Sequence, residues 1–315
     1  MNRKPLIILT GPTSVGKTAL SIALAKNING EIISADSMQV YRKMDIGTAK
    51  ITLEEMDGVP HYLMNELEPD EEFNVVKFQQ LAKKYIQQIY EKNKIPILVG
   101  GTGFYIQAVL YDIDFTENET DTAYRAELEQ LLEERGGDYL YELLKEIDTD
   151  SAVAIHPNNS KKVIRALEYA RMTGEKISEH NREQRQKSSP YQFCYFVLNR
   201  DRASLYENIN KRVELMLRNG LLEEVKQLKD LGYTRELVSM QGLGYKELLA
   251  YLEGEVTLEE AVEILKRDTR HFAKRQITWF KREKEVIWVN KEEFISDQEV
   301  LGYILYHLHE KNILM

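Results

Sequence analysis

Residues 9–20, LTGPTSVGKTAL, contain the pattern G-x-x-x-x-G-K-T, which is typical of loops that bind phosphate groups. Glycines allow backbone N–H groups to surround phosphate oxygens, and the N-terminus of a following helix adds a favourable dipole. We expect Lys17 to neutralise phosphate charge and the Thr18 hydroxyl to bind Mg²⁺. The predicted diphosphate-binding residues are Gly11, Pro12, Thr13, Ser14, Val15, Gly16, Lys17 and Thr18.

The carboxylate best placed to work with this loop is Asp36, directly after the apolar run EIISA. A P-loop NTPase also needs an acidic residue at the end of a strand, but the run PILVGG that reaches Gly100 contains no Asp or Glu. Asp36 could remove a proton from a hydroxyl in a kinase, or accept one from an attacking amine while pyrophosphate leaves. The loop and Asp36 by themselves leave both chemistries open.

The elements that position these residues follow a strand–helix alternation. PLIILTG, GEIISADS and IPILVGGTGF are short apolar runs, each followed by glycine or polar residues, and they indicate buried strands. KTALSIALAK and residues 74–92 have apolar residues at helical spacing. The pattern predicts an α/β fold with a parallel sheet flanked by helices, and residues 11–18, 36–39 and 100–105 should meet beyond the carboxyl ends of the strands.

From residue 117 to residue 189 the strand signals stop. Residues 125–135, 139–147 and 158–174 are predicted helices, the last of them starting at Asn159 or Ser160 and ending at Gly174. Strand-like runs return at residues 193–198 and 286–290. We therefore expect a P-loop NTPase-like catalytic core, residues 1–116 and 190–315, with an inserted all-helical domain, residues 117–189.

The composition leaves a nucleic-acid partner open. The net charge of −9 argues against one, but residues 266–285 carry eight lysines and arginines that could form a local basic face. No stretch approaches the ~20 apolar residues that span a bilayer, so we expect no membrane association. The single cysteine, Cys194, lies in an apolar run and permits no internal disulfide, so we expect a cytoplasmic protein. For the oligomeric state, a monomer is the default expectation.

Several segments resemble the bacterial tRNA dimethylallyltransferases, also called tRNA isopentenyltransferases. They are GPTSVGKT, SADSMQVYRKMDIGTAK, PILVGGTGFY, IHPNNSKKVIRALE, GLGYKE and AKRQITWF, in consistent order from Leu9 to about Phe280. The resemblance implies transfer of a dimethylallyl group from dimethylallyl diphosphate to N6 of the adenosine 3′ to the anticodon, with release of diphosphate. It also implies a P-loop core with a helical insertion. The eukaryotic relatives have a C-terminal zinc finger, for which this chain lacks the cysteines.

The resemblance assigns a role to each part of the predicted site. The loop would hold the diphosphate with Mg²⁺ near Thr18, and Asp36 would be the general base toward the exocyclic amine. Thr13 and Lys17 would stabilise the departing pyrophosphate, and Arg212 matches a family arginine that contacts it. The predicted catalytic residues are therefore Asp36, Thr13, Lys17 and Arg212.

The resemblance also implies which residues contact the anticodon stem-loop of the tRNA. This chain departs from the family pattern at Gln241 and Lys246, which replace two arginines and so weaken any bidentate contact there. The predicted tRNA-binding residues are Asp36, Ser37, Met38, Gln39, Thr102, Asn159, Ser160, Lys161, Lys162, Val163, Gln241, Gly242, Leu243, Gly244, Tyr245 and Lys246.

Two other functions stay open at this point. A small-molecule or nucleotide kinase would share the P-loop core, although no arginine-rich lid motif is evident in the sequence. A P-loop protein that binds RNA without chemistry would have no use for a carboxylate opposite the phosphate loop. Prenyl transfer to tRNA accounts for more of the sequence than either alternative.

Overall fold

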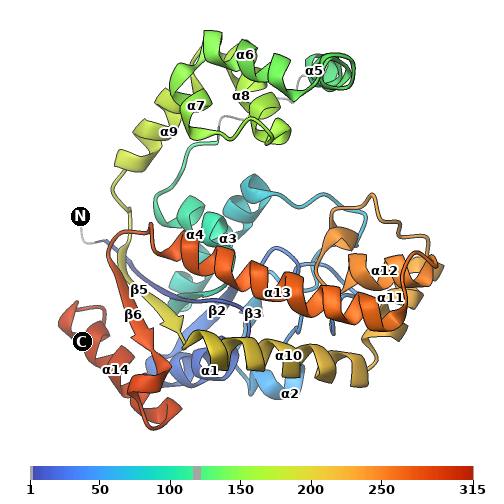
Figure 1. Cartoon of the computed structure of the whole chain (residues 1–315). Helices are drawn as coiled ribbons and strands as arrows, with labels where there is room; N and C mark the ends of the chain where they lie inside the picture. The colour runs from blue at the N-terminus through green and yellow to red at the C-terminus, as the bar shows by residue number, and fades with distance from the viewer. Residues whose placement is uncertain (1–2, 116–121, 315) are drawn as a thin grey trace. The chain divides into compact units, whose positions relative to one another are not determined.

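The computed structural model describes residues 3–115 and 122–314 (Figure 1). The chain divides into two compact units, one formed by Met1–Leu110 with Pro190–Met315 and the other by Tyr111–Ser189. The domain boundary expected between residues 116 and 117 lies outside the described residues.

The first unit is built on a six-stranded sheet with the order β3-β2-β4-β1-β5-β6. Every neighbouring pair of strands is parallel, as the strand–helix alternation predicts. The α/β fold expected from the sequence is therefore confirmed. The strands are β1 (Pro5–Thr10), β2 (Gly30–Ala35), β3 (His61–Tyr62), β4 (Ile95–Gly100), β5 (Gln192–Asn199) and β6 (Val286–Asn290).

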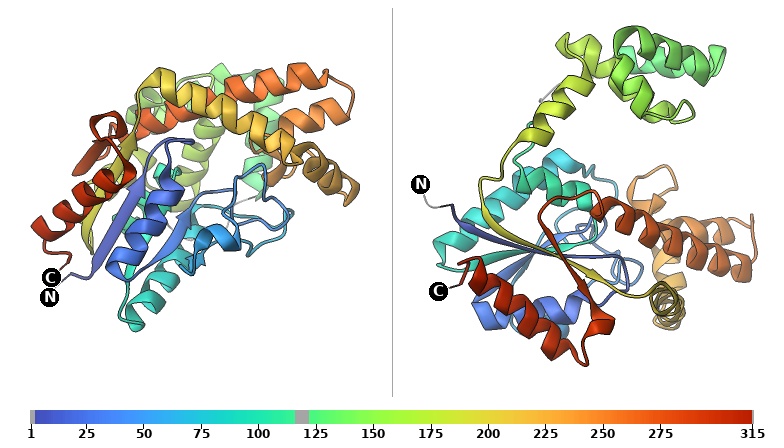
Figure 2. Two further views of the ribbon diagram at one scale, coloured as in Figure 1. Left: turned by 90° about the horizontal axis from the view of Figure 1, so that it is seen from below. Right: turned by 60° about the vertical axis from the view of Figure 1, so that its left-hand side comes forward.

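Helices cover both faces of this sheet (Figure 2). Helices α1 (Lys17–Ile28) and α14 (Asp297–Glu310) lie on one face, where they pack on each other and on the apolar side chains of the strands. Helices α3 (Val75–Glu91) and α4 (Gly103–Leu110) lie on the other face. The apolar period of α3 and its N-cap residue Asn74, which accepts hydrogen bonds from the N–H groups of Val76 and Lys77, explain why this segment is helical. A short helix, α2 (Leu53–Met56), precedes β3.

A group of helices extends from one end of the same unit. In Figure 1, α10 and α13 lie side by side, and α12 packs against α13. These helices bring residues from the last third of the sequence close to the loops that follow β1 and β2. They are α10 (Arg202–Arg218), α11 (Leu221–Asp230), α12 (Tyr245–Leu252) and α13 (Leu258–Phe280), with short 3-10 turns at Ser239–Gln241 and Lys291–Glu293.

The second unit is all-helical in its described residues, as the sequence predicts. Its core contains Leu128, Leu140, Leu144 and Leu167. Helix α8 begins after the N-cap Asn159, whose side chain accepts a hydrogen bond from the N–H of Lys162, and it ends at Gly174 in the left-handed conformation. The helices are α5 (Thr122–Arg135), α6 (Gly137–Ile147), α7 (Thr149–Ala154), α8 (Ser160–Thr173) and α9 (Ile177–Gln186).

Strands β2, β4 and β1 are neighbours, and their carboxyl ends lie side by side. Gly100 pairs with Ala35 on one side and with Thr10 on the other, and the Thr10 hydroxyl donates a hydrogen bond of 2.6 Å to the Gly100 carbonyl. The three loops that carry the predicted chemistry therefore begin next to one another, at the carboxyl ends of three adjacent strands.

We expect Gly100→Ala to destabilise the protein strongly, because a Cβ at this position would lie 2.1 Å from the Ala35 carbonyl oxygen. Strand β4 is paired on both sides, so its backbone cannot move aside, and the free energy of unfolding should fall by about 3 kcal/mol or more. The matched control is Gly302→Ala in helix α14, where a Cβ meets no atom within 4 Å. That substitution should raise the free energy of unfolding by about 0.5–1 kcal/mol. Urea unfolding measures both changes, and equal midpoints for the two variants would contradict this account of the sheet edge.

Candidate active site

The phosphate loop has the backbone geometry that its sequence predicts. Gly11, Ser14 and Gly16 have φ angles of 146°, 63° and 94°, and helix α1 begins immediately afterwards at Lys17. A Cβ at Gly16 would lie 2.9 Å from the Nζ atom of Lys291, a buried lysine that pairs with Asp297. A loop of this shape turns its N–H groups toward one point, at the N-terminus of a helix, and so favours an anion.

Lys17 lies against the loop and does not extend into solvent. Its ammonium donates hydrogen bonds of 2.9 and 2.8 Å to the carbonyl oxygens of Gly11 and Pro12. Burial, followed by repulsion from the Arg212 guanidinium, lowers the pKa of Lys17 to about 7, and the Asp36 carboxylate acts in the opposite direction. The charge on Lys17 is therefore sensitive to what binds beside it.

Asp36 and Arg212 complete a cluster of charges around the loop. The Asp36 carboxylate accepts a hydrogen bond of 2.9 Å from the N–H of Met38, which fixes its direction after strand β2. Burial lowers the pKa of Arg212, and the charge of Asp36 raises it. Arg212 comes from α10 and is largely covered, so it is not a solvated arginine on a helix surface. The cluster brings one carboxylate and two cations to the phosphate loop.

Gln276, on helix α13, is a site residue that the sequence analysis did not single out. Its Oε1 accepts a hydrogen bond of 2.9 Å from the N–H of Thr13, and its Nε2 donates one of 3.0 Å to the carbonyl of Gly101. The buried amide thereby joins the phosphate loop to the loop after β4. Its place in the quoted segment AKRQITWF was the signal that could have identified it.

Four of the predicted tRNA-binding residues, Ser37, Met38, Gln39 and Thr102, adjoin this cluster. The amide of Gln39 accepts a hydrogen bond from the Ser34 hydroxyl at 2.9 Å and donates one to the Thr48 carbonyl at 3.4 Å. Thr102 follows the next strand, and its N–H donates to the Ala35 carbonyl at 3.2 Å. Ser37 and Met38 lie between Asp36 and Gln39 and are partly exposed. The structure thus brings Asp36, residues 37–39 and Thr102 together.

Residues 241–246 lie beside this segment. A Cβ at Gly242 would lie 2.5 Å from the Cε atom of Met38, so the two loops are in contact. The Tyr245 side chain is fully buried. The Val163 side chain is also buried, in the core of the helical unit. Tyr245 and Val163 both lie on the buried face of a helix, and their side chains support the neighbouring residues by packing in the core.

In the helical unit, the predicted RNA contacts lie at the start of α8. Lys161 and Lys162 are exposed there, next to the N-cap Asn159 and to Ser160, the first helical residue. Two lysines beside the positive end of a helix dipole favour phosphate groups.

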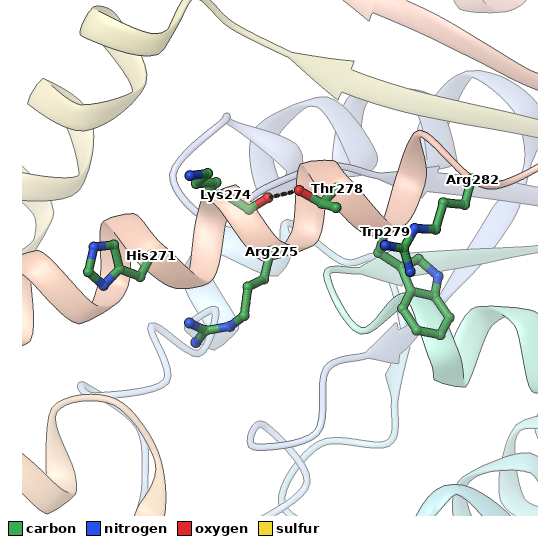
Figure 3. Close-up of a pocket in the computed structure, with 6 residues that line it drawn as sticks. All are labelled: His271, Lys274, Arg275, Thr278, Trp279 and Arg282. Atoms are coloured by element: carbon green, nitrogen blue, oxygen red, sulfur yellow. Dashed lines mark hydrogen bonds between the residues drawn. The ribbon is translucent and has the colours of Figure 1, made fainter. Parts of the chain in front are cut away.

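A basic pocket of about 370 Å³ lies along the C-terminal half of α13 and the turn that follows (Figure 3). The Trp279 ring packs against the start of α4, since a Cβ at Gly103 would lie 2.2 Å from its Cδ1 atom. Lys266, Arg267 and Arg270 nearer the start of α13 are instead bound to Glu214, Asp268 and Asn210. The pocket is lined by His271, Lys274, Arg275, Thr278, Trp279 and Arg282.

No group of three or more His, Cys, Asp and Glu side chains is arranged to hold a metal ion within residues 3–115 and 122–314. Within the same ranges, no helix has the length and apolar character that crossing a membrane requires.

The fold and the site define a P-loop α/β protein in which one carboxylate and two cations lie near the phosphate loop. The chain belongs to the IPP transferase family, whose model matches residues 39–283. It is 66% identical over 311 residues to a tRNA dimethylallyltransferase of Lachnoclostridium phytofermentans, covering 99% of each chain. It is 51% identical over 310 residues to a tRNA dimethylallyltransferase of Clostridioides difficile, covering 98% of this chain and 99% of that protein.

Solved structures give the same family. The full-length tRNA isopentenylpyrophosphate transferase of Bacillus halodurans is 45% identical, with a TM-score of 0.73 and 98% of both chains covered. A eukaryotic dimethylallyltransferase acting on tRNA is 32% identical, with a TM-score of 0.84, covering 98% of this chain and 80% of that one. The resemblance noted in the sequence is confirmed, and the comparisons favour the transferase over the kinase.

Proposed function

We propose that this protein transfers the dimethylallyl group of dimethylallyl diphosphate to N6 of the adenosine 3′ to the anticodon of tRNA. The observation that carries the proposal is the position of Asp36 opposite a phosphate loop whose charges, Lys17 and Arg212, interact with it. In such a cluster the carboxylate can take up a proton while the cations stabilise a departing anion. The names of the relatives support the same substrates.

In the proposed reaction, the N6 lone pair forms a bond to the allylic C1 carbon, and the C1–O bond breaks with its electrons going to the diphosphate. Asp36 takes the proton from N6, and the hydrogen bond from Met38 holds its carboxylate in place for that transfer. The loop N–H groups, Thr13, Lys17 and Arg212 bind the charge that develops on the leaving diphosphate. N6 is a poor nucleophile, so its alignment with C1 should contribute as much as the base.

The site fits Mg²⁺ as an ion that is held mainly by the diphosphate. Thr18 is exposed on the first turn of α1, beside the loop, and its hydroxyl is a suitable oxygen donor. Mg²⁺ retains several waters and takes few protein ligands when phosphates supply the remainder, so one hydroxyl from the protein would suffice. When bound, it would neutralise phosphate charge.

For the tRNA, we propose that the target adenine leaves the anticodon loop and enters between residues 36–39 and Thr102. Extrusion from a single-stranded loop costs on the order of a few kcal/mol or less. The basic pocket on α13, residues 241–246, and residues 159–163 of the helical unit would bind the RNA backbone around it.

The test is to incubate the protein with Mg²⁺, dimethylallyl diphosphate and an unmodified tRNA that has adenosine after its anticodon. The tRNA is then digested and its nucleosides are weighed. We expect one adenosine to gain the mass of a C5H8 unit. The proposal fails if no adenosine gains it and the protein instead consumes ATP with another acceptor.

We expect Lys161→Glu with Lys162→Glu to weaken tRNA binding about tenfold at low salt and to reduce its salt dependence, because each lost phosphate contact lowers the slope of log K against log salt by about 1. Binding titrations at several salt concentrations measure both effects. Lys145→Glu is the control, since this lysine of the same unit already pairs with Glu142. Equal salt slopes in the double variant and the control would refute the contact.

A further inference from the structure

We propose that Glu224, on the first turn of α11, is a positioning residue that holds residues 36–48 and residues 241–246 in one arrangement for the tRNA substrate. The inference rests on the proposed function and deepens it, because it separates the part of the protein that presents the adenine from the part that binds the diphosphate.

The Glu224 carboxylate is bound by three successive backbone N–H groups. Its Oε2 accepts hydrogen bonds of 2.9 Å from Asp45 and 2.7 Å from Ile46, and its Oε1 accepts one of 3.0 Å from Gly47. Consecutive N–H groups that point at one carboxylate form a concave anion site, and hydrogen bonds to a charged acceptor are about twice as strong as neutral ones. A residue of α11 therefore sets the path of a loop nearly 180 residues earlier in the chain.

The same carboxylate also binds Tyr245. The phenol donates a hydrogen bond of 2.7 Å to Oε1 of Glu224, and burial, followed by the charge of that carboxylate, raises the pKa of the phenol, so the donor stays protonated. The Tyr245 ring lies flush against Gly47, where a Cβ would be 2.5 Å from the Cζ atom. Glu224 thereby fastens residues 45–47 to the start of α12 and to the loop that precedes it.

Both joined segments lead to residues that are proposed to face the adenine. The Thr48 carbonyl, directly after the bound loop, accepts the hydrogen bond from Gln39 that orients its amide. On the other side, Gly242 packs against Met38. Loss of the Glu224 contacts would release the supports of Gln39 and Met38 together.

The phosphate loop is held by different groups. Thr13 is fixed by Gln276, and Lys17 by the carbonyls of Gly11 and Pro12. None of these hydrogen bonds includes Glu224 or residues 45–47. A change at Glu224 should therefore affect the tRNA substrate and spare the diphosphate, which a general loss of stability would not do.

The experiment compares Glu224→Gln with Glu223→Gln. A glutamine keeps the shape of the side chain but turns an NH2 group toward N–H donors, whereas Glu223 is exposed on the same turn of α11 and loses the same charge. We expect kcat/KM for tRNA at saturating dimethylallyl diphosphate to fall at least about tenfold in Glu224→Gln. The Kd for pyrophosphate, measured by calorimetry, should stay within about twofold of the native value. Glu223→Gln should behave as the native protein in both measurements.

The inference is overturned if the two variants have equal kcat/KM for tRNA, or if Glu224→Gln loses tRNA turnover and pyrophosphate affinity to the same extent. Should Glu224→Gln fail to fold, Tyr245→Phe removes one of the four hydrogen bonds and keeps the ring. It should lower kcat/KM for tRNA about threefold to tenfold without changing pyrophosphate affinity, and native kinetics in this variant would also refute the role. A native protein that forms no prenylated adenosine refutes the proposed function, whereas an active native protein with an equally active Glu224→Gln refutes only the positioning role.

Discussion

Asp36→Asn is expected to lower kcat for prenyl transfer by about 10²–10⁴-fold, the range attributed to a well-placed general base. Asparagine keeps the oxygen that accepts the hydrogen bond from Met38, so the turn after β2 should retain its shape. What is lost is the group that takes the proton from N6 as the new C–N bond forms. Single-turnover measurements with saturating tRNA and dimethylallyl diphosphate isolate this step from product release.

The effect on diphosphate binding should be much smaller, and its size depends on pH. Asp36 raises the pKa of Lys17, so its loss moves the pKa of Lys17 below about 7 and leaves less of the lysine charged at neutral pH. At pH 6 the affinity for pyrophosphate should approach that of the native protein, and at pH 8 it should be weaker. Asp70→Asn, an exposed position of the same unit, is the control for removal of one negative charge. A native rate in Asp36→Asn would exclude Asp36 as the base.

Lys17→Met is expected to lower kcat by about 10²–10³-fold, which is typical of removing one group that stabilises developing negative charge. It should also weaken the binding of dimethylallyl diphosphate, because the loop then retains its N–H groups without their adjacent cation. Lys26→Met, in the last turn of the same helix, removes an exposed lysine and should have native kinetics. Loss of activity in both variants would indicate damage to α1, which would contradict a specific role for Lys17.

Lys17 should also make diphosphate binding depend on pH. In the free protein its pKa is about 7, so the ammonium loses its proton as the pH rises through 7. A bound diphosphate favours the charged form and raises that pKa, so binding above pH 7 takes up a proton. The Kd for pyrophosphate should then rise up to about tenfold per pH unit between pH 7 and 9.

Lys17→Arg tests whether Lys17 is the group responsible for the pH dependence of the Kd. A guanidinium stays charged throughout this range, so the rise of Kd above pH 7 should disappear in any Lys17→Arg protein that folds, even if its kcat is reduced. A native pH profile in this variant would assign the titration to another group. Asp36 and Lys17 share one cluster, so the effects of their substitutions should not add in a double variant.

The sequence by itself determined the features that depend on neighbouring residues. The phosphate loop follows from its glycines, the strands from short apolar runs, and α8 from its apolar period between Asn159 and Gly174. Each of these is decided by residues within one turn or one strand of each other, which is the range over which backbone hydrogen bonding and side-chain period act. The segments that resemble the family carried the functional assignment further than any local pattern could.

Only the tertiary structure decided which distant residues meet at the site. The hydrogen bond from Thr13 to Gln276 joins residues 263 positions apart, and Glu224 reaches Asp45 across 179 positions. The covered position of Arg212 beside Asp36, and the burial of Tyr245 and Val163, likewise depend on how helices pack against the sheet and on each other. A carboxylate or amide has the same local pattern whether it faces solvent or a backbone N–H group, so its partner is determined only when the chain has folded.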